Sequence, residues 1–223
     1  MPASQVLVGA PSNVSNPDGA LVTQLGGKQG DGIVSELHGK YYTQNYRGNL
    51  YYGANAAAGA AFTIFSNASY VGLLLWNPQG SGKNLSLVRA GIAFDTQAST
   101  AMAGWGYAWI INAGSGLATA APISAFTAIT ATRGSCILGA TGQGASVALL
   151  GSAATLTTAF ANWRPANFST STGAITVAFS ASQMSEELDG TLIVPPGVAM
   201  GLTSNILSGV TASGYMIWEE IPL

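Results

Sequence analysis

The sequence contains few charged residues. Asp, Glu, Lys and Arg make up only 7% of its 223 residues, against roughly 25% in ordinary domains. Seven basic and nine acidic side chains give a net charge of −2. The arginines are scattered, so no basic stripe is present to neutralise nucleic-acid phosphates. The exterior is therefore either covered by Ser, Thr, Asn and Gln or packed against other copies and partners, and we favour the second.

Cysteine and histidine each occur once, as Cys136 and His38. A single cysteine excludes an intrachain disulfide, and we interpret Cys136 as a small buried apolar residue. One histidine and one cysteine do not suffice for an ordinary zinc site. His38, two residues after Glu36, fits a surface or interface position better than the role of a general base. We expect no metal and no cofactor.

Long apolar runs are also missing. Residues 101–121 carry no charge, but several glycines, Asn112 and Ser115 interrupt them, which argues against a membrane-spanning helix. The first twenty residues lack the basic segment and apolar run of a signal peptide. These patterns predict synthesis in a cytoplasm and no membrane partner.

The chain divides near residue 60. Residues 1–60 contain three early prolines, a glycine-rich stretch and a tyrosine cluster, without a persistent helical or strand period. We interpret them as an extended N-terminal arm that docks on a partner. Tyrosine and arginine are enriched at interface centres, so the candidate interface residues are Tyr41, Tyr42, Tyr46, Arg47, Tyr51 and Tyr52.

Residues 61–223 show the two-residue period of β-strands, with turn residues about every dozen positions. Residues 70–76 read as a strand buried on both faces, and the strand after Lys83 is expected to bulge near Arg89. Ser182–Leu188 is the one helix-like stretch. The pattern predicts an all-β antiparallel sandwich, jelly-roll-like in architecture. Its expected core includes Trp76, Trp105, Trp109, Ile175, Val177 and Phe179.

The sequence contains no clear motif for a catalytic or nucleotide-binding site. Gly80–Lys83 ends like a phosphate-binding loop, but Asn77 replaces the first glycine and a strand pattern follows, so we predict a plain turn. No Gly-x-Ser-x-Gly nucleophile elbow occurs. Glu219 and Glu220 are adjacent on a predicted strand and point to opposite faces, so they cannot flank one sugar bond. Glu186 and Glu187 are expected in a solvated turn.

The ring-bearing face Trp105, Tyr107 and Trp109 has two interpretations. It fits a sugar-stacking platform of a receptor-binding domain, although an alternating aromatic face on a strand is more often core. The whole set of motifs, on balance, predicts a protein that is not an enzyme.

Four phrases carry a resemblance to a known class of proteins. They are HGKYYTQNYRGNLYYGAN, GLLLWNPQGSGKNLSLVRAGIAF, LIVPPGVAMGL and YMIWEEIPL. The chain resembles structural proteins of tailed bacteriophages, and is most similar to capsid decoration, or cement, proteins. The resemblance implies a sandwich or jelly-roll subunit, often a homotrimer, on the outer capsid surface of the virion. Its implied partner is the major capsid protein, and no catalytic residues are implied. A receptor-binding, head-fibre or tail-associated adhesin domain remains the alternative.

Overall fold

The structure is a computed structural model that describes residues 39–55, 60–61, 69–94, 104–110, 123–130, 133–139, 146–156, 159–160, 162–168, 183–204 and 211–223. The chain divides into two units, Met1–Thr43 and a larger compact unit, Gln44–Leu223. The boundary expected at residue 60 therefore lies earlier, because Leu50–Ala54 already forms a strand inside a sheet. Within the described ranges, no helix has the length and apolar character needed to cross a membrane.

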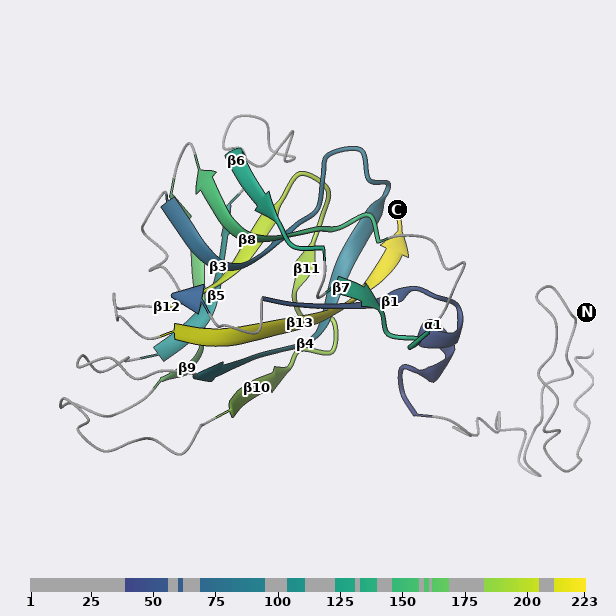
Figure 1. The fold of residues 1–223 in the computed structure, drawn as a ribbon. Coiled ribbons are helices and arrows are strands. Elements are labelled where there is room, and N and C mark those ends of the chain that lie inside the picture. The colour runs from purple at the N-terminus through teal and green to yellow at the C-terminus, as the bar shows by residue number, and fades with distance from the viewer. Residues whose placement is uncertain are drawn as a thin grey trace, which may run out of the picture. The chain divides into compact units, whose positions relative to one another are not determined.

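The described elements are almost entirely strands (Figure 1). In chain order they are α1 (Tyr42–Tyr46), β1 (Leu50–Ala54), β2 (Ala60–Ala61), β3 (Ser69–Trp76), β4 (Lys83–Phe94), β5 (Gly104–Ile110), β6 (Ile123–Ala128), β7 (Arg133–Ser135), β8 (Leu149–Leu156), β9 (Asn162–Phe168), β10 (Gln183–Glu187), β11 (Ile193–Val194), β12 (Ala199–Ser204) and β13 (Thr211–Pro222).

Two antiparallel sheets pack against each other. The seven-stranded sheet has the order β10-β4-β13-β1-β7, with β11 on β4 and β2 on β13, and the six-stranded sheet has the order β6-β8-β3-β12-β5-β9. The pairs β1–β13, β3–β12, β4–β10 and β5–β9 are nested along the chain and alternate between the sheets. This nesting is the pattern of a jelly roll, in which one long hairpin wraps around a core. The predicted jelly-roll-like sandwich is confirmed.

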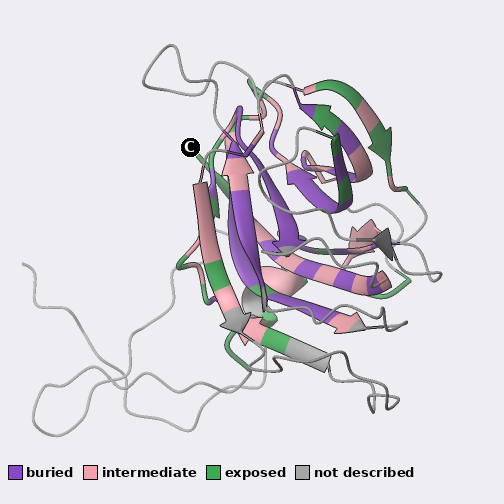
Figure 2. Ribbon diagram, turned by 90° about the vertical axis from the view of Figure 1, so that its left-hand side faces the viewer, coloured by how far each residue is buried: buried purple, intermediate pink, exposed green. Residues whose placement is uncertain are grey.

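The main core lies between the sheets, and a bulge in β4 makes it continuous. Ile217 pairs with Arg89 but Trp218 pairs with Leu87, so β4 contributes one extra residue there. The extra residue reverses the alternation, and Leu87 and Ala90 consequently face the same interior. The bulge expected near Arg89 is thereby confirmed. Figure 2 shows the buried residues concentrated along the strands of the two layers.

A second apolar cluster lies on the opposite face of the six-stranded sheet. Leu73 and Leu75 belong to the main core, whereas Leu74 and Trp76 belong to the second cluster, so β3 is apolar on both faces as predicted. Tyr70 is fully buried there, and its hydroxyl oxygen lies 2.8 and 2.7 Å from the carbonyl oxygens of Leu73 and Leu202, which share its single proton. Its ring lies over Gly201, where an added Cβ would be 2.8 Å from the ring.

The expected core tryptophans are found in both clusters. Trp105 is 1% exposed in the main core, Trp109 packs partly buried against that core, and Trp76 packs partly buried against the second cluster. Ile175, Val177 and Phe179 lie outside the described residues.

Two segments differ from the prediction. Ser182–Leu188 was expected to be helical, but Gln183–Glu187 forms strand β10 on the edge of the seven-stranded sheet. Its two adjacent glutamates hide the alternation that is typical of a strand. The sheet tolerates them because each pairs with an arginine, as described below. Strand β9 contains Pro165 and was not anticipated; the proline is tolerated because β9 is an edge strand.

Asn77 connects three segments at one end of the sandwich. It is fully buried, and its Nδ2 donates to the carbonyls of Lys83 and Val194, both at 2.8 Å. Its backbone N–H donates to the Val198 carbonyl at 3.0 Å, and its carbonyl accepts from Gly197 at 2.8 Å. The side chain therefore holds the start of β4 and the end of β11 together.

Replacing Asn77 by Ala should destabilise the fold by about 1–3 kcal/mol, because two buried carbonyls lose their donor. The matched control is Asn84→Ala, one residue into β4, whose side chain is only half-buried. Urea denaturation followed by intrinsic tryptophan fluorescence measures both. Equal midpoints for the two variants would contradict this assignment.

Candidate functional site

The structure separates the six candidate interface residues. Tyr51 is only 4% exposed and stacks on Trp218, with ring centroids 6.3 Å apart, so it is a core residue. Tyr52, the next residue on β1, points to the outer face and is 37% exposed. Because successive side chains of a strand alternate, only one of this pair is accessible.

The other four lie before β1. In the compact unit, Tyr46 is 67% exposed and Arg47 is also exposed. In the first unit, Tyr42 is 50% exposed, and the Lys40 ammonium lies 5.3 Å from the centre of the Tyr41 ring. Of the six candidates, Tyr46, Arg47 and Tyr52 are therefore the exposed ones within the compact unit.

A buried carboxylate near the end of β13 accepts hydrogen bonds from two side chains and one backbone N–H. The Glu220 side chain is fully buried, and its Oε2 accepts from Lys83 Nζ at 2.8 Å. Its Oε1 accepts from Ser146 Oγ at 2.6 Å and from the Val147 N–H at 2.8 Å. Three donors thus satisfy the carboxylate, which would otherwise be costly to bury.

This Glu220 cluster joins distant parts of the chain and affects its neighbour Tyr51. Lys83 begins β4, Ser146 precedes β8, and Glu220 is near the end of β13. Burial raises the pKa of the Tyr51 hydroxyl, and the nearby Glu220 carboxylate raises it further. Both carboxylate oxygens of Glu220 already accept hydrogen bonds. The cluster is therefore suited to holding strands together rather than to proton transfer.

A second polar cluster closes one edge of the sandwich. Arg164 on β9 donates from Nη2 to Glu186 Oε1 on β10 at 2.8 Å, joining the edge strands of the two sheets. The Arg164 guanidinium also lies 5.6 Å from the centre of the Tyr107 ring. Burial raises the pKa of the Tyr107 hydroxyl, and the Glu186 carboxylate raises it further. On the outer face, Glu187 pairs with Arg89.

These contacts correct the expectation for Glu186 and Glu187. Instead of sharing a solvated turn, they alternate on β10, one facing the other sheet and one facing outward. Glu219 and Glu220 alternate as predicted, with Glu219 half-buried on the outer side and Glu220 inside. Neither pair can act jointly on one glycosidic bond.

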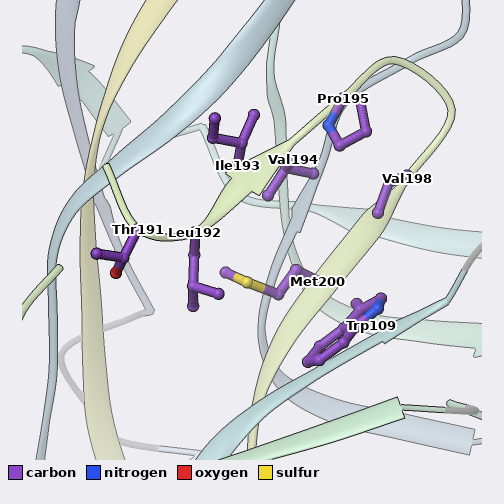
Figure 3. Close-up of a pocket in the computed structure, with 8 residues that line it drawn as sticks. All are labelled: Trp109, Thr191, Leu192, Ile193, Val194, Pro195, Val198 and Met200. Carbon is purple, nitrogen blue, oxygen red and sulfur yellow. The ribbon is translucent and has the colours of Figure 1, made fainter. Parts of the chain in front are cut away.

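An apolar pocket lies beside β11 and β12 (Figure 3). It has a volume of about 340 Å³, near the lower end of ligand pockets. Trp109 and Met200 pair across β5 and β12 and form one wall. The lining comprises Trp109, Thr191, Leu192, Ile193, Val194, Pro195, Val198 and Met200. Without an ionisable lining residue, this pocket can hold an apolar group but cannot perform acid–base chemistry.

The pocket decides between the two interpretations of the aromatic face. Trp105 and Tyr107 are 1% and 0% exposed, so they are core residues. Trp109 alone of the three borders a hollow in the surface. A continuous sugar-stacking platform of all three rings is therefore absent.

The remaining candidates from the sequence are the Gly80–Lys83 motif, Cys136 and His38. Residues 80–82 lie in the turn that leads into β4, as predicted, and Lys83, the first residue of that strand, pairs with Glu220. Cys136 is half-buried, and burial raises the pKa of its thiol to about 11. The described residues contain no group of three His, Cys, Asp or Glu side chains that could hold a metal. His38 lies outside the described residues.

Comparisons with known proteins give no relative. No protein-family model matches the chain, and neither a curated protein nor a solved structure is significantly similar to it.

The adjacent glutamates allow a controlled test of the Glu220 cluster. Glu220→Gln should destabilise the fold by about 1–3 kcal/mol, because the amide cannot accept from all three donors. Glu219→Gln should be neutral or stabilising at pH 7. Burial raises the pKa of Glu219 in the fold, so ionisation of this carboxyl above that pKa disfavours the folded state. Equal denaturation midpoints for the two variants at pH 7 would contradict the assignment.

The tryptophans should differ in their contribution to stability. Trp105→Ala should cost about 3–5 kcal/mol, as expected for a large residue deleted from a core. Trp109→Ala should cost less, because this residue is half-buried and borders the pocket. Urea denaturation of both variants checks the order, and a Trp109 variant as unstable as the Trp105 variant would show that the pocket wall is core.

Proposed function

We propose that this protein decorates and stabilises a bacteriophage capsid by bridging subunits of the major capsid protein, without catalysing a reaction. The proposed location is the outer surface of the virion, and the proposed solution unit is a homotrimer. The resemblance of the sequence phrases to decoration proteins suggests this role, and a jelly-roll sandwich is an architecture found in viral capsid domains.

The observation that carries the proposal is the internal use of charge. Between Gln44 and Leu223, the described residues include ten with charged side chains, and six of them form three ion pairs. Arg133 additionally donates to the Ala148 carbonyl at 2.8 Å. The described surface thus carries few charges, and several of these, such as Arg89 and Glu187, are already paired with one another. Its uncharged groups are easier to desolvate against a partner than charges are.

Exposed large side chains supply apolar contact area for such a partner. Tyr46, Ile193 and Leu138 are 67%, 55% and 85% exposed. Repeating a modest contact of this kind over a symmetric shell would give large total stabilisation without any single tight interface.

The alternative is a receptor-binding or fibre-associated adhesin, and the Trp109 pocket is the observation that favours it. A half-buried tryptophan beside an uncharged pocket resembles a stacking position for a ligand ring. A glycan array would discriminate the two functions: an adhesin should bind a glycan and lose that binding in Trp109→Ala. A decoration protein should bind shells whether or not Trp109 is present.

The capsid role is tested by mixing the purified chain with decoration-free shells of the parent phage. The full chain should bind at a fixed copy number per shell, measured by cryo-electron microscopy. Deleting residues 1–40 should leave the compact unit folded, since that unit begins at Gln44, and should lower occupancy by removing interface rather than core.

Circular dichroism and thermal melting of the truncated chain provide the folding control. Failure of the full chain to bind any shell would overturn the capsid role. Equal occupancy of the two chains would instead assign attachment to the sandwich and not to the arm.

A further inference from the structure

Among the described strands, β10 and β7 end one sheet and β6 and β9 end the other, and the two-residue strands β11 and β2 also pair on one side only. Three of the four end strands carry features that discourage pairing with another strand. Strand β10 has Glu186 and Glu187, strand β9 has Arg164 and Pro165, and strand β7 has only three residues, one of them Arg133. Charges, prolines and short length are the usual means by which proteins block edge-to-edge association. The fourth end strand, β6, has no charge and no proline and is longer than β7; its ladder with β8 shifts register after Ile123 and after Thr127.

Strand β6 reads ISAFTA over Ile123–Ala128, with no charge and no proline. It pairs with β8 on one side, and among the described residues no strand pairs with its other side. Ser124, Ala125 and Thr127 are exposed. An uncharged six-residue edge of this kind is a template for another strand.

The edge is also rigidly supported. The Phe126 ring lies over Gly151 of β8, where it leaves no room for a Cβ, and meets Trp76 edge-on with centroids 5.5 Å apart. The Ser124 hydroxyl donates to the Thr155 carbonyl at 3.1 Å. These contacts support the central residues 125–127, which pair with β8 in regular register between the two shifts, and a supported segment loses less entropy when a further strand pairs with it.

We propose that two copies of this chain associate through antiparallel pairing of their β6 edges about a two-fold axis, which joins two six-stranded sheets into one. A second copy is favoured as the occupant by charge. Self-pairing of β10 or β9 would bring glutamates or arginines of the two copies close together, whereas self-pairing of β6 brings no like charges together. An isologous contact also needs only one self-complementary element, and an antiparallel strand pair provides it.

The pairing predicts an even number of chains per particle in solution: a dimer, or a hexamer if two trimers are joined. Light scattering coupled to size-exclusion chromatography measures the mass. Ala125→Lys and Thr127→Lys should each halve it, because each new charge would lie near its symmetry mate, directly opposite or diagonal to it, across the two-fold axis. The matched control is Thr155→Lys, on β8 directly opposite Ala125 and exposed, one strand away from the edge. It should leave the mass unchanged.

Hydrogen exchange of the unmodified chain gives an independent readout. Amides of residues 123–128 should be protected at high protein concentration and lose protection on dilution, whereas those of β10 should not change. A wild-type mass of one or three chains would overturn the proposal, as would edge-strand lysines that leave the mass unchanged in folded variants. So would protection of residues 123–128 that is independent of concentration. None of these measurements involves a capsid, so their outcome is separate from that of the capsid role.

Discussion

The pairing of β4 with β13 is the contact on which the rest of the fold depends. Both strands are twelve residues long, and their ladder runs from Ala212 opposite Phe94 to Pro222 opposite Lys83. Every other strand of the seven-stranded sheet is attached to one of these two, apart from β7, which pairs with β1. The single bulge in the ladder lets Leu87 and Ala90 enter the same core, so sheet geometry and core composition are coupled at one position.

Much of this architecture is readable in the sequence. The two-residue period of residues 61–223, the doubly apolar run of β3 and the irregularity of β4 all predict what the structure contains. These signals are strong because they arise from burial, which acts on every second residue of a strand. Segments β9 and β10 are less readable, since Pro165 and the paired glutamates are tolerated only at sheet edges, and edge position is a property of the whole topology.

The polar clusters were not predictable as constellations. The alternation of Glu219 and Glu220 indicates that one of them points inward, but nothing local identifies its partners. Lys83 and Ser146 are 137 and 74 residues away in sequence. Likewise, the tyrosine cluster suggests an interface from composition alone, whereas strand alternation places Tyr51 in the core and Tyr52 outside. Tertiary pairing decides both outcomes, and a local pattern carries little information about it.

The nested order of strands has a consequence for folding. Asn55, at the end of β1, donates from its side chain to the carbonyl of Ala212, 157 residues later, and that contact closes the outermost pair of the jelly roll. During synthesis, β1 consequently emerges long before its partner exists and remains unpaired until β13 has left the ribosome. Closing so many distant contacts is slow compared with forming local ones. The chain therefore passes through a period in which unpaired strands are accessible, and the edge-protecting charges of β9 and β10 are useful then, before any native sheet has formed.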